Sequence, residues 1–144
     1  MLRISTIEYH GSHYKEWLAV RHTMLRAPLG LKFTSEQLAK DEKDTLLAAF
    51  WNDGIVGTLI IHHVSKEEAK LRQMAVLDAH QGKNIGSALM AYAEGSIVTQ
   101  PYEIISLHAR QGAVGFYKKH GYRMIGEPFI EVTLAHLRME KSLR

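Results

Sequence analysis

The chain has 144 residues, of which 46% are hydrophobic and 23% charged, and its formal net charge is +3. This size suits one hydrophobic core, so we expect a single domain over residues 1–144. The lack of a run of 18 apolar residues excludes a membrane-spanning helix. The lack of cysteine excludes disulfides, thiolate metal sites and a cysteine nucleophile. The chain has no block of lysine and arginine residues, so its charge pattern does not indicate nucleic-acid binding.

Hydrophobic periodicity predicts alternating strands and helices. In chain order, we expect a strand at 2–8, a helix at 12–26, a short helix from an N-cap at Ser35 to about Asp41, strands at 45–51, 55–63 and 69–77, a helix at 82–98, a strand at 103–109, a helix at 112–120, and strands at 122–126 and 130–139. The tripeptide Asn52-Asp53-Gly54 is a strong hairpin signal. The order β-α-α-β-β-β-α-β-α-β-β predicts an α/β protein with a mixed sheet and helices on both faces.

The segment from Met74 to Leu89 is the most informative part of the chain. An apolar strand is followed by a polar loop and a helix whose first turn contains Gly82 and Gly86. This arrangement presents backbone N–H groups and the positive end of a helix dipole to an anion. Glycine lets a phosphate approach the main chain closely, and Lys83 adds a positive charge. These features predict a cofactor that carries a diphosphate.

Two motifs resemble those of the GNAT superfamily of acetyl-CoA-dependent N-acetyltransferases. The segment 81–86 (QGKNIG) is similar to the Arg/Gln-x-x-Gly-x-Gly/Ala signature, with Asn84 in place of the middle glycine. The segment 113–122 (AVGFYKKHGY) is similar to the second motif of the superfamily. The resemblance implies the GNAT fold, a mixed and mostly antiparallel sheet of six to seven strands, splayed in the middle, with about four helices on both faces.

A narrower similarity covers nearly the whole chain. The segments 21–30 (RHTMLRAPLG) and 126–131 (GEPFIE), followed by His136 and Met139, resemble the small bacterial ElaA-type subgroup. In that subgroup a proline commonly precedes the histidine, and here Ala135 takes its place. This similarity makes the expected fold more specific, but it does not identify the acceptor, because many members of the subgroup have no settled substrate.

The resemblance implies a site for acetyl-CoA. Backbone amides of 81–87 would hold the pyrophosphate, the strand at 74–76 would pair with the pantetheine arm, and a β-bulge near Ala75 would open a slot for the thioester, with the Val76 N–H facing its carbonyl. The residues assigned to the cofactor are Met74, Ala75, Val76, Gln81, Gly82, Lys83, Asn84, Ile85, Gly86, Ser87, Arg110, Ala113, Phe116 and Tyr117. Arg110 stands where many members carry an asparagine that touches the pantetheine, and an arginine there would bind either CoA phosphate or an acidic substrate instead.

The resemblance also implies catalytic roles. Tyr117 occupies the position of the general acid that protonates the leaving thiolate. An acceptor amine must lose a proton before attack, and we rank His108 first among the candidate bases, ahead of Glu131, His136 and Asp78. Glu131 and His136 are expected to border the acceptor, on opposite faces if they lie on one regular strand.

The loop at 27–33, which contains Leu29, is a candidate lid over the acceptor. The nine histidines show no metal-ligand spacing, because His62 and His63 are neighbours whose side chains diverge on a strand. The sequence lacks the glycine-rich motif that binds NAD, the lysine loop that binds ATP and the serine motif of the hydrolases. We therefore expect no metal.

A direct-transfer N-acetyltransferase is the preferred function. Two alternatives stay open, an acetyl-CoA sensor that has lost catalysis, motivated by Asn84 and Arg110, and an interaction scaffold. The partners expected are acetyl-CoA and an amine, with neither nucleic acid nor membrane. A cytoplasmic location is also expected. Dimerisation is common in the superfamily, and the sequence leaves the choice between monomer and homodimer open.

Overall fold

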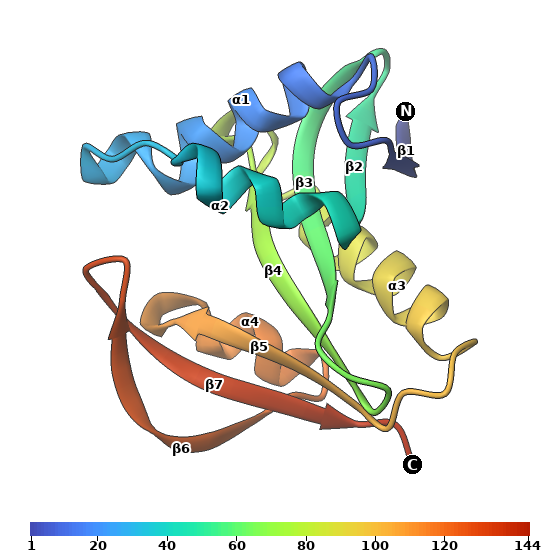
Figure 1. Ribbon diagram of the computed structural model, residues 1–144, viewed down its shortest axis with the longest axis vertical. Helices are drawn as coiled ribbons and strands as arrows, with labels where there is room; N and C mark the ends of the chain where they lie inside the picture. Colours follow the sequence, from blue (N-terminus) through green and yellow to red (C-terminus); the bar gives the residue numbers. More distant parts are fainter.

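Seven strands form one sheet (Figure 1), and the computed structural model describes all residues from 1 to 144. The strands are β1 (Leu2–Ile7), β2 (Thr45–Trp51), β3 (Gly54–His63), β4 (Glu68–Val76), β5 (Ile104–Arg110), β6 (Arg123–Glu131) and β7 (Leu134–Ser142). Their order across the sheet is β1-β2-β3-β4-β5-β7-β6. All neighbours are antiparallel except β4 and β5, which run parallel. The predicted element order and mixed sheet are confirmed.

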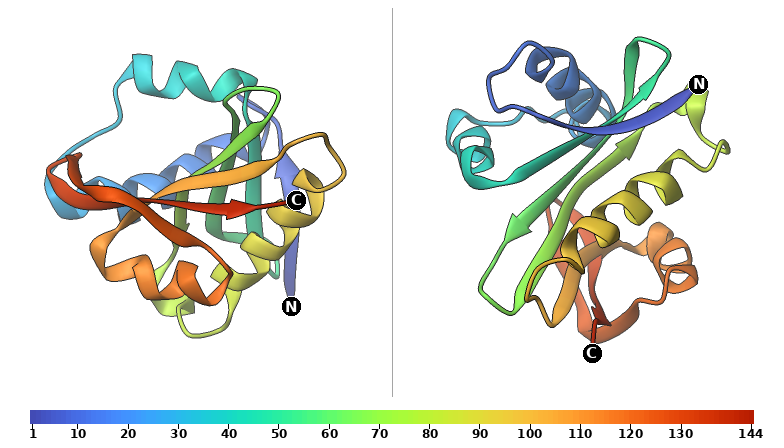
Figure 2. Two further views of the ribbon diagram at one scale, coloured as in Figure 1. Left: turned by 90° about the horizontal axis from the view of Figure 1, so that it is seen from below. Right: turned by 90° about the vertical axis from the view of Figure 1, so that its right-hand side faces the viewer.

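Four helices flank this sheet. They are α1 (Tyr14–Leu25), α2 (Ser35–Ala39), α3 (Ile85–Ile97) and α4 (Val114–Lys119), and short 3₁₀ turns occupy 27–29, 40–43, 78–80 and 111–113. Figure 2 shows α1 and α3 on opposite faces of the sheet. None of the helices is both long and apolar enough to cross a membrane.

The two-sided burial of β2 explains this layering. Alternate side chains of a strand point to opposite faces, so Leu46 and Phe50 pack beneath Trp17 of α1, whereas Leu47 packs with Leu89 of α3 on the other face. A strand buried on both sides reads as a continuous apolar run, as the sequence of β2 does. The molecule therefore has two cores with the sheet between them.

The predicted helix starts differ from the observed ones by one to three residues, and the differences at α2 and α3 have a clear cause. Thr34, not Ser35, caps α2, because its Oγ1 accepts the Gln37 N–H at 3.1 Å while Gln37 Oε1 accepts the Thr34 N–H at 2.9 Å. This is a capping box, whose Thr-x-x-Gln pattern is visible in the sequence. The helix α3 begins at Ile85 instead of residue 82, because Gly82 and Asn84 have φ of 83° and 62°, outside the helical region.

One extra residue in β4 separates it from β5. Thr58 of β3 pairs with Ala75 and Ile60 pairs with Arg72, so β4 contains one more residue than β3 between these pairs. Gln73 there has a φ of 57°. Parallel pairing of β4 with β5 covers only 68–71 against 104–107. The bulge predicted near Ala75 and the splayed sheet are confirmed, because an extra residue bends and twists its strand.

The final hairpin differs from the prediction. A single strand was expected at 130–139, but a two-residue turn at Val132 and Thr133 divides it into the end of β6 and the start of β7. Both turn residues are left-handed, with φ of 49° and 64°. Hairpin turns of this kind favour asparagine and glycine, and β-branched residues at positive φ are strained. The turn therefore lacks its usual sequence signal.

Candidate active site

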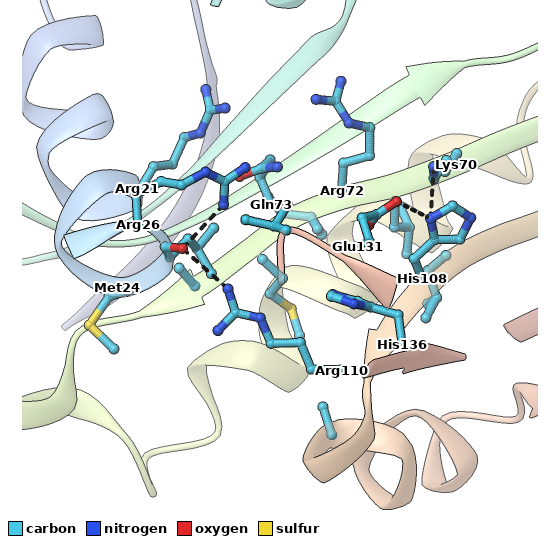
Figure 3. Close-up of a pocket in the computed structure, with 18 of the residues that line it drawn as sticks. Arg21, Met24, Arg26, Lys70, Arg72, Gln73, His108, Arg110, Glu131 and His136 are labelled. Atoms are coloured by element: carbon cyan, nitrogen blue, oxygen red, sulfur yellow. Dashed lines mark hydrogen bonds and ion pairs between the residues drawn. The ribbon is translucent and has the colours of Figure 1, made fainter. Parts of the chain in front are cut away.

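A cavity of about 470 Å³ opens where β4 and β5 separate (Figure 3). Its walls come from β4, the C-terminal end of α1, the end of β5, α4 and the hairpin of β6 and β7. The predicted site residues that line it are Met74, Ala75, Val76, Gln81, His108, Arg110, Ala113, Tyr117, Glu131 and His136. The others, which lie outside it, are 82–87, Phe116 and Leu29. The motifs thus converge on one cleft.

The loop at 82–87 presents free backbone donors beside this cavity. None of its six N–H groups donates to another backbone group of the protein, as expected for the first turn of a helix and the loop before it. Asn84 adopts the left-handed conformation, with φ 62° and ψ 23°. Asparagine tolerates this conformation better than most residues. The replacement of the usual glycine is therefore compatible with an open loop.

Gln81 fixes this loop in place. Its Nε2 donates to Val76 O at 3.0 Å and to Asp78 Oδ1 at 3.2 Å, which ties the loop to the end of β4. A Cβ on Gly86 would lie 3.4 Å from Phe116 Cζ, which is ordinary van der Waals contact. The expectation that Gly86 gives a phosphate access to the main chain stays a prediction.

The Val76 N–H points into the gap between β4 and β5. Leu77 N–H donates to Val56 O at 2.9 Å, on the β3 side of the strand. Amides of successive residues in a strand point to opposite edges, so the Val76 amide faces away from β3. Consistent with this, Val76 O accepts the Gln81 side chain and not a β3 donor. This N–H is a free donor at the gap.

Tyr117 reaches the cavity from α4. Its ring lies edge-on to Phe116 and to Tyr122, with centroid distances of 5.1 and 6.2 Å. Burial raises the pKa of the Tyr117 hydroxyl to about 12, and the positive charge of Arg110 opposes this effect. The hydroxyl therefore stays protonated at neutral pH and is available as a hydrogen-bond donor.

His108 forms a polar triad with residues from two other strands (Figure 3). Its Nδ1 lies 2.9 Å from Glu131 Oε2 and 3.3 Å from Lys70 Nζ. One ring nitrogen cannot both donate to a carboxylate and accept from an ammonium. The shorter distance assigns the proton to Nδ1, donating to Glu131, and leaves Nε2 with a free lone pair. Burial and then Lys70 lower the His108 pKa, while Glu131 opposes them. The neutral ring can accept a proton.

Glu131 and His136 lie on the same face of the sheet, because they do not belong to the one regular strand on which a spacing of five would place them on opposite faces. The turn between them places Glu131 on β6 and His136 on β7, and both line the cavity. His136 Nδ1 donates to Leu134 O at 2.8 Å, and its ring stacks on Phe129. Residues five apart in the sequence meet here because the chain reverses between them.

Several basic residues of the cavity were not predicted from the sequence. They are Arg21, Arg26, Lys40, Lys70 and Arg72. A signal existed in β4, where Glu68, Lys70 and Arg72 alternate with the buried residues Ala69 and Leu71. Such alternation indicates one polar face, but it does not show what that face borders.

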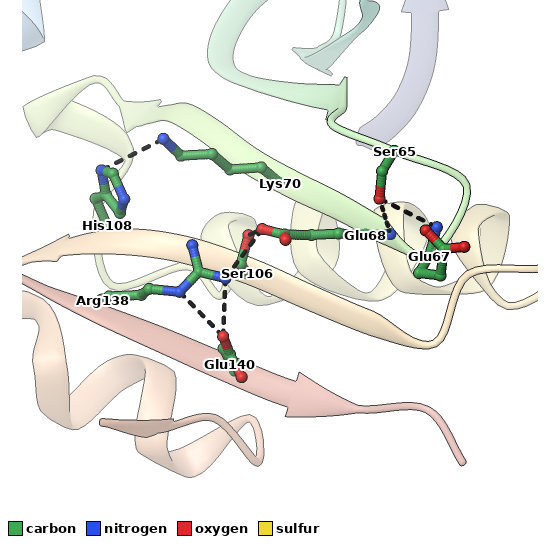
Figure 4. A network of polar contacts seen from close by, with 8 residues as sticks. All are labelled: Ser65, Glu67, Glu68, Lys70, Ser106, His108, Arg138 and Glu140. Atoms are coloured by element: carbon green, nitrogen blue, oxygen red, sulfur yellow. Dashed lines mark hydrogen bonds and ion pairs between the residues drawn. The ribbon is translucent and has the colours of Figure 1, made fainter. Parts of the chain in front are cut away.

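A polar network closes the paired end of the cleft (Figure 4). Ser106 Oγ donates to Glu68 Oε2 at 2.6 Å, and Arg138 Nη2 donates to the same oxygen at 3.0 Å. Arg138 also holds Glu140 of its own strand at 2.8 Å. The network joins β4, β5 and β7 on the face that carries His108 and Lys70. It fixes the strands at the point from which they separate.

The buried pair of Arg21 and Asp41 anchors α1 beside the cavity. Arg21 Nη1 lies 2.7 Å from Asp41 Oδ2, and their side chains are 1% and 0% exposed. The Tyr14 hydroxyl donates to the same carboxylate at 3.3 Å. The pair joins α1 to the 40–43 turn that precedes β2. It therefore sets the position of the α1 wall.

The comparisons with known proteins agree with this geometry. A sequence model described as the acetyltransferase (GNAT) domain matches residues 24–143. The chain belongs to the GNAT acetyltransferase family. YitI of Bacillus subtilis, an uncharacterized N-acetyltransferase, is 26% identical over 151 residues that cover 100% of this chain and 98% of YitI. YjcF of the same organism, also an uncharacterized N-acetyltransferase, is 36% identical over 74 residues, and the match spans about half of each protein (51% and 53%).

Solved structures show the same GNAT fold. Escherichia coli ElaA superposes with a TM-score of 0.83 at 16% identity, over 99% of this chain and 100% of ElaA. A GNAT family acetyltransferase of Elizabethkingia anophelis, solved with acetyl-CoA bound, superposes with a TM-score of 0.76 at 16% identity, over 99% and 98% of the two chains. Acetyl-CoA binding is thus documented for a protein of this fold.

Removal of the Asp41 carboxylate tests the anchor. Asp41→Ala leaves the Arg21 charge buried without its partner, and we expect the free energy of unfolding to fall by about 3–5 kcal/mol. Urea denaturation measures this change. The matched control is Glu42→Ala, at an exposed position of the same turn, which should change stability by less than about 0.5 kcal/mol. Equal stability of the two variants would contradict an anchoring role for the pair.

Proposed function

We propose that this protein transfers the acetyl group of acetyl-CoA directly to a primary amine. The observation that carries the proposal is the cleft between β4 and β5, which has free backbone donors at its mouth and an acid and a base candidate on its walls. A cofactor phosphate fits the loop at 82–87, because that loop offers six N–H groups at a helix N-terminus. The unpaired edge of β4 suits the amide groups of a pantetheine arm.

The residues around the gap match the charges that develop during acyl transfer. Acetyl-CoA supplies an activated thioester. The Val76 N–H, which faces the gap, would stabilise negative charge on the carbonyl oxygen. The protonated hydroxyl of Tyr117 would donate to the sulfur as the carbon–sulfur bond breaks. The carbon–nitrogen bond would form at the same carbonyl carbon, without an acyl-enzyme.

His108 is our proposed base. Its free Nε2 would take the proton that the amine loses, and Glu131 would hold the ring through Nδ1 and stabilise the resulting positive charge. Lys70, beside the ring, helps to keep the imidazole neutral before the reaction. Glu131 would act as a positioning residue in this arrangement, and His136 borders the same space.

Acetyl-CoA should bind the purified protein with a Kd on the order of micromolar, and ATP should not match it. Lys83→Glu should weaken this binding about tenfold, because it reverses a charge at the phosphate loop. The control Lys15→Glu makes the same charge change at an exposed position of α1, far from the loop, and should leave the Kd unchanged. Calorimetric titration measures all three proteins. An absence of acetyl-CoA binding would refute the proposed function.

Tyr117→Phe should lower kcat by about 10²-fold or more and leave the Kd for acetyl-CoA unchanged. The substitution removes only the hydroxyl and keeps the ring packing with Phe116 and Tyr122. Thiol release in the presence of a panel of amines measures kcat, and calorimetry measures the Kd. An unchanged kcat would remove Tyr117 from the mechanism. Binding without turnover of any amine would favour the acetyl-CoA sensor.

The pH dependence of kcat should report His108. Because burial lowers the His108 pKa below its ordinary value of about 6.5, the neutral base predominates above that pH. We expect kcat to rise with pH, to reach its plateau by about pH 7 and to show no fall near pH 10, since Tyr117 keeps its proton to about pH 12. His108→Gln should abolish the rise and lower the plateau. A wild-type rise centred above pH 8 would exclude His108 as the base.

A further inference from the structure

Two guanidinium groups share one carbonyl oxygen at the cavity wall (Figure 3). Arg26 Nη1 donates to Leu25 O at 3.1 Å, and Arg110 Nη2 donates to the same oxygen at 3.3 Å. Arg26 is only 7% exposed. Neither arginine has a carboxylate within ion-pair distance. Since arginine stays protonated in proteins, two positive charges lie together here without a negative partner.

Two other guanidinium groups of the cavity have carboxylate partners, whereas Lys40 has none within ion-pair distance. Arg21 and Arg72 are held from behind by Asp41 and Asp44, at 2.7 and 3.2 Å. Glu131 is the only carboxylate that lines the cavity, and it lies with His108 and Lys70, away from the arginine pair (Figure 3). The charges of Glu131 and Lys70 offset each other, so an excess of positive charge lies at Arg26 and Arg110.

This arrangement is costly unless an anion completes it. Burial lowers the pKa of Arg26, and the neighbouring charges of Arg21 and Arg110 lower it further. The Phe33 ring, 4.2 Å from the Arg26 guanidinium carbon, holds that group in place. A guanidinium presents N–H donors in a planar fork that matches the oxygens of a carboxylate or phosphate. Two such groups side by side, without a carboxylate partner, suit an anion of this kind.

The proposed site for the cofactor phosphates is the loop at 82–87, which lies away from the arginine pair. The arginine pair is therefore available to bind the acceptor. The loop at 82–87 begins α3, and α3 packs on the face of the sheet opposite α1, which ends at Leu25 beside Arg26. The arginine pair and the phosphate loop are thus on different sides of the gap.

We infer that the acceptor is a small amine that carries an oxyanion group, a carboxylate or a phosphate, bound between Arg26 and Arg110. This inference rests on the proposed function. The amine end then lies toward His108, whose free Nε2 removes the proton.

Anion titration tests the site without turnover. With the phosphate loop saturated by CoA, inorganic phosphate and acetate are titrated calorimetrically into the protein. We expect at least one of them to bind, and its Kd to weaken at least tenfold in Arg26→Gln and in Arg110→Gln. The matched control Arg123→Gln removes the same charge from an exposed position of β6 and should change nothing. A Kd unaffected by both cavity substitutions, or no anion binding at all, would overturn the inference.

Matched pairs of acceptors show whether the oxyanion group of the acceptor is a carboxylate or a phosphate. Thiol release is measured with amino acids against their amides and with phosphoethanolamine against ethanolamine. One charged member should exceed its neutral counterpart at least tenfold in kcat/KM, and Arg26→Gln should remove that preference without changing the KM for acetyl-CoA. Equal turnover within both pairs would refute the inference and leave the transferase proposal intact. Arg26-dependent anion binding with no turnover of any amine would support the anion site and contradict the transferase proposal.

Discussion

The extra residue of β4 at Gln73 is the constraint on which the site depends. Regular parallel pairing beyond Leu71 would continue the sheet and use the backbone groups of β4 to bind β5. The bulge ends that pairing and turns the Val76 amide toward an open gap. The same gap lets Tyr117 reach the cavity from one face while Arg26 approaches from the other. A local irregularity of the backbone thus joins the two sides of the sheet.

Charge determines how the cavity is divided. Buried charges are tolerated in proteins when they are paired and hydrogen-bonded, and Arg21 with Asp41 meets this condition. Such a pair is weak evidence for high stability, because removal of both ions from water costs about as much as their attraction returns. Its clearest effect is positional, since it holds the end of α1 against the sheet. Arg26 has no carboxylate partner and lies about one turn after Arg21 at the end of α1. The Arg21–Asp41 pair therefore also sets the position of Arg26.

The sequence was sufficient for the fold because its signals are local. Apolar alternation located the strands, and the spacing of the loop at 81–86 and of the segment at 113–122 identified the family. The site was only partly predictable. Arg110 reaches Leu25 O, to which Arg26 also donates, across 85 positions of sequence, and no local pattern contains that contact. The hairpin at Val132 was missed for a different reason. Its turn contains β-branched residues, whereas such turns prefer asparagine and glycine.

That unfavourable hairpin has a consequence for how the protein can change over time. Glu131 directly precedes the turn, so the position of the carboxylate that holds His108 depends on a backbone conformation that Val132 and Thr133 adopt only at a cost. Glycine or asparagine at these two positions would relieve that cost. A substitution that changes the shape of the turn therefore alters the stability of the hairpin and the surroundings of His108 together.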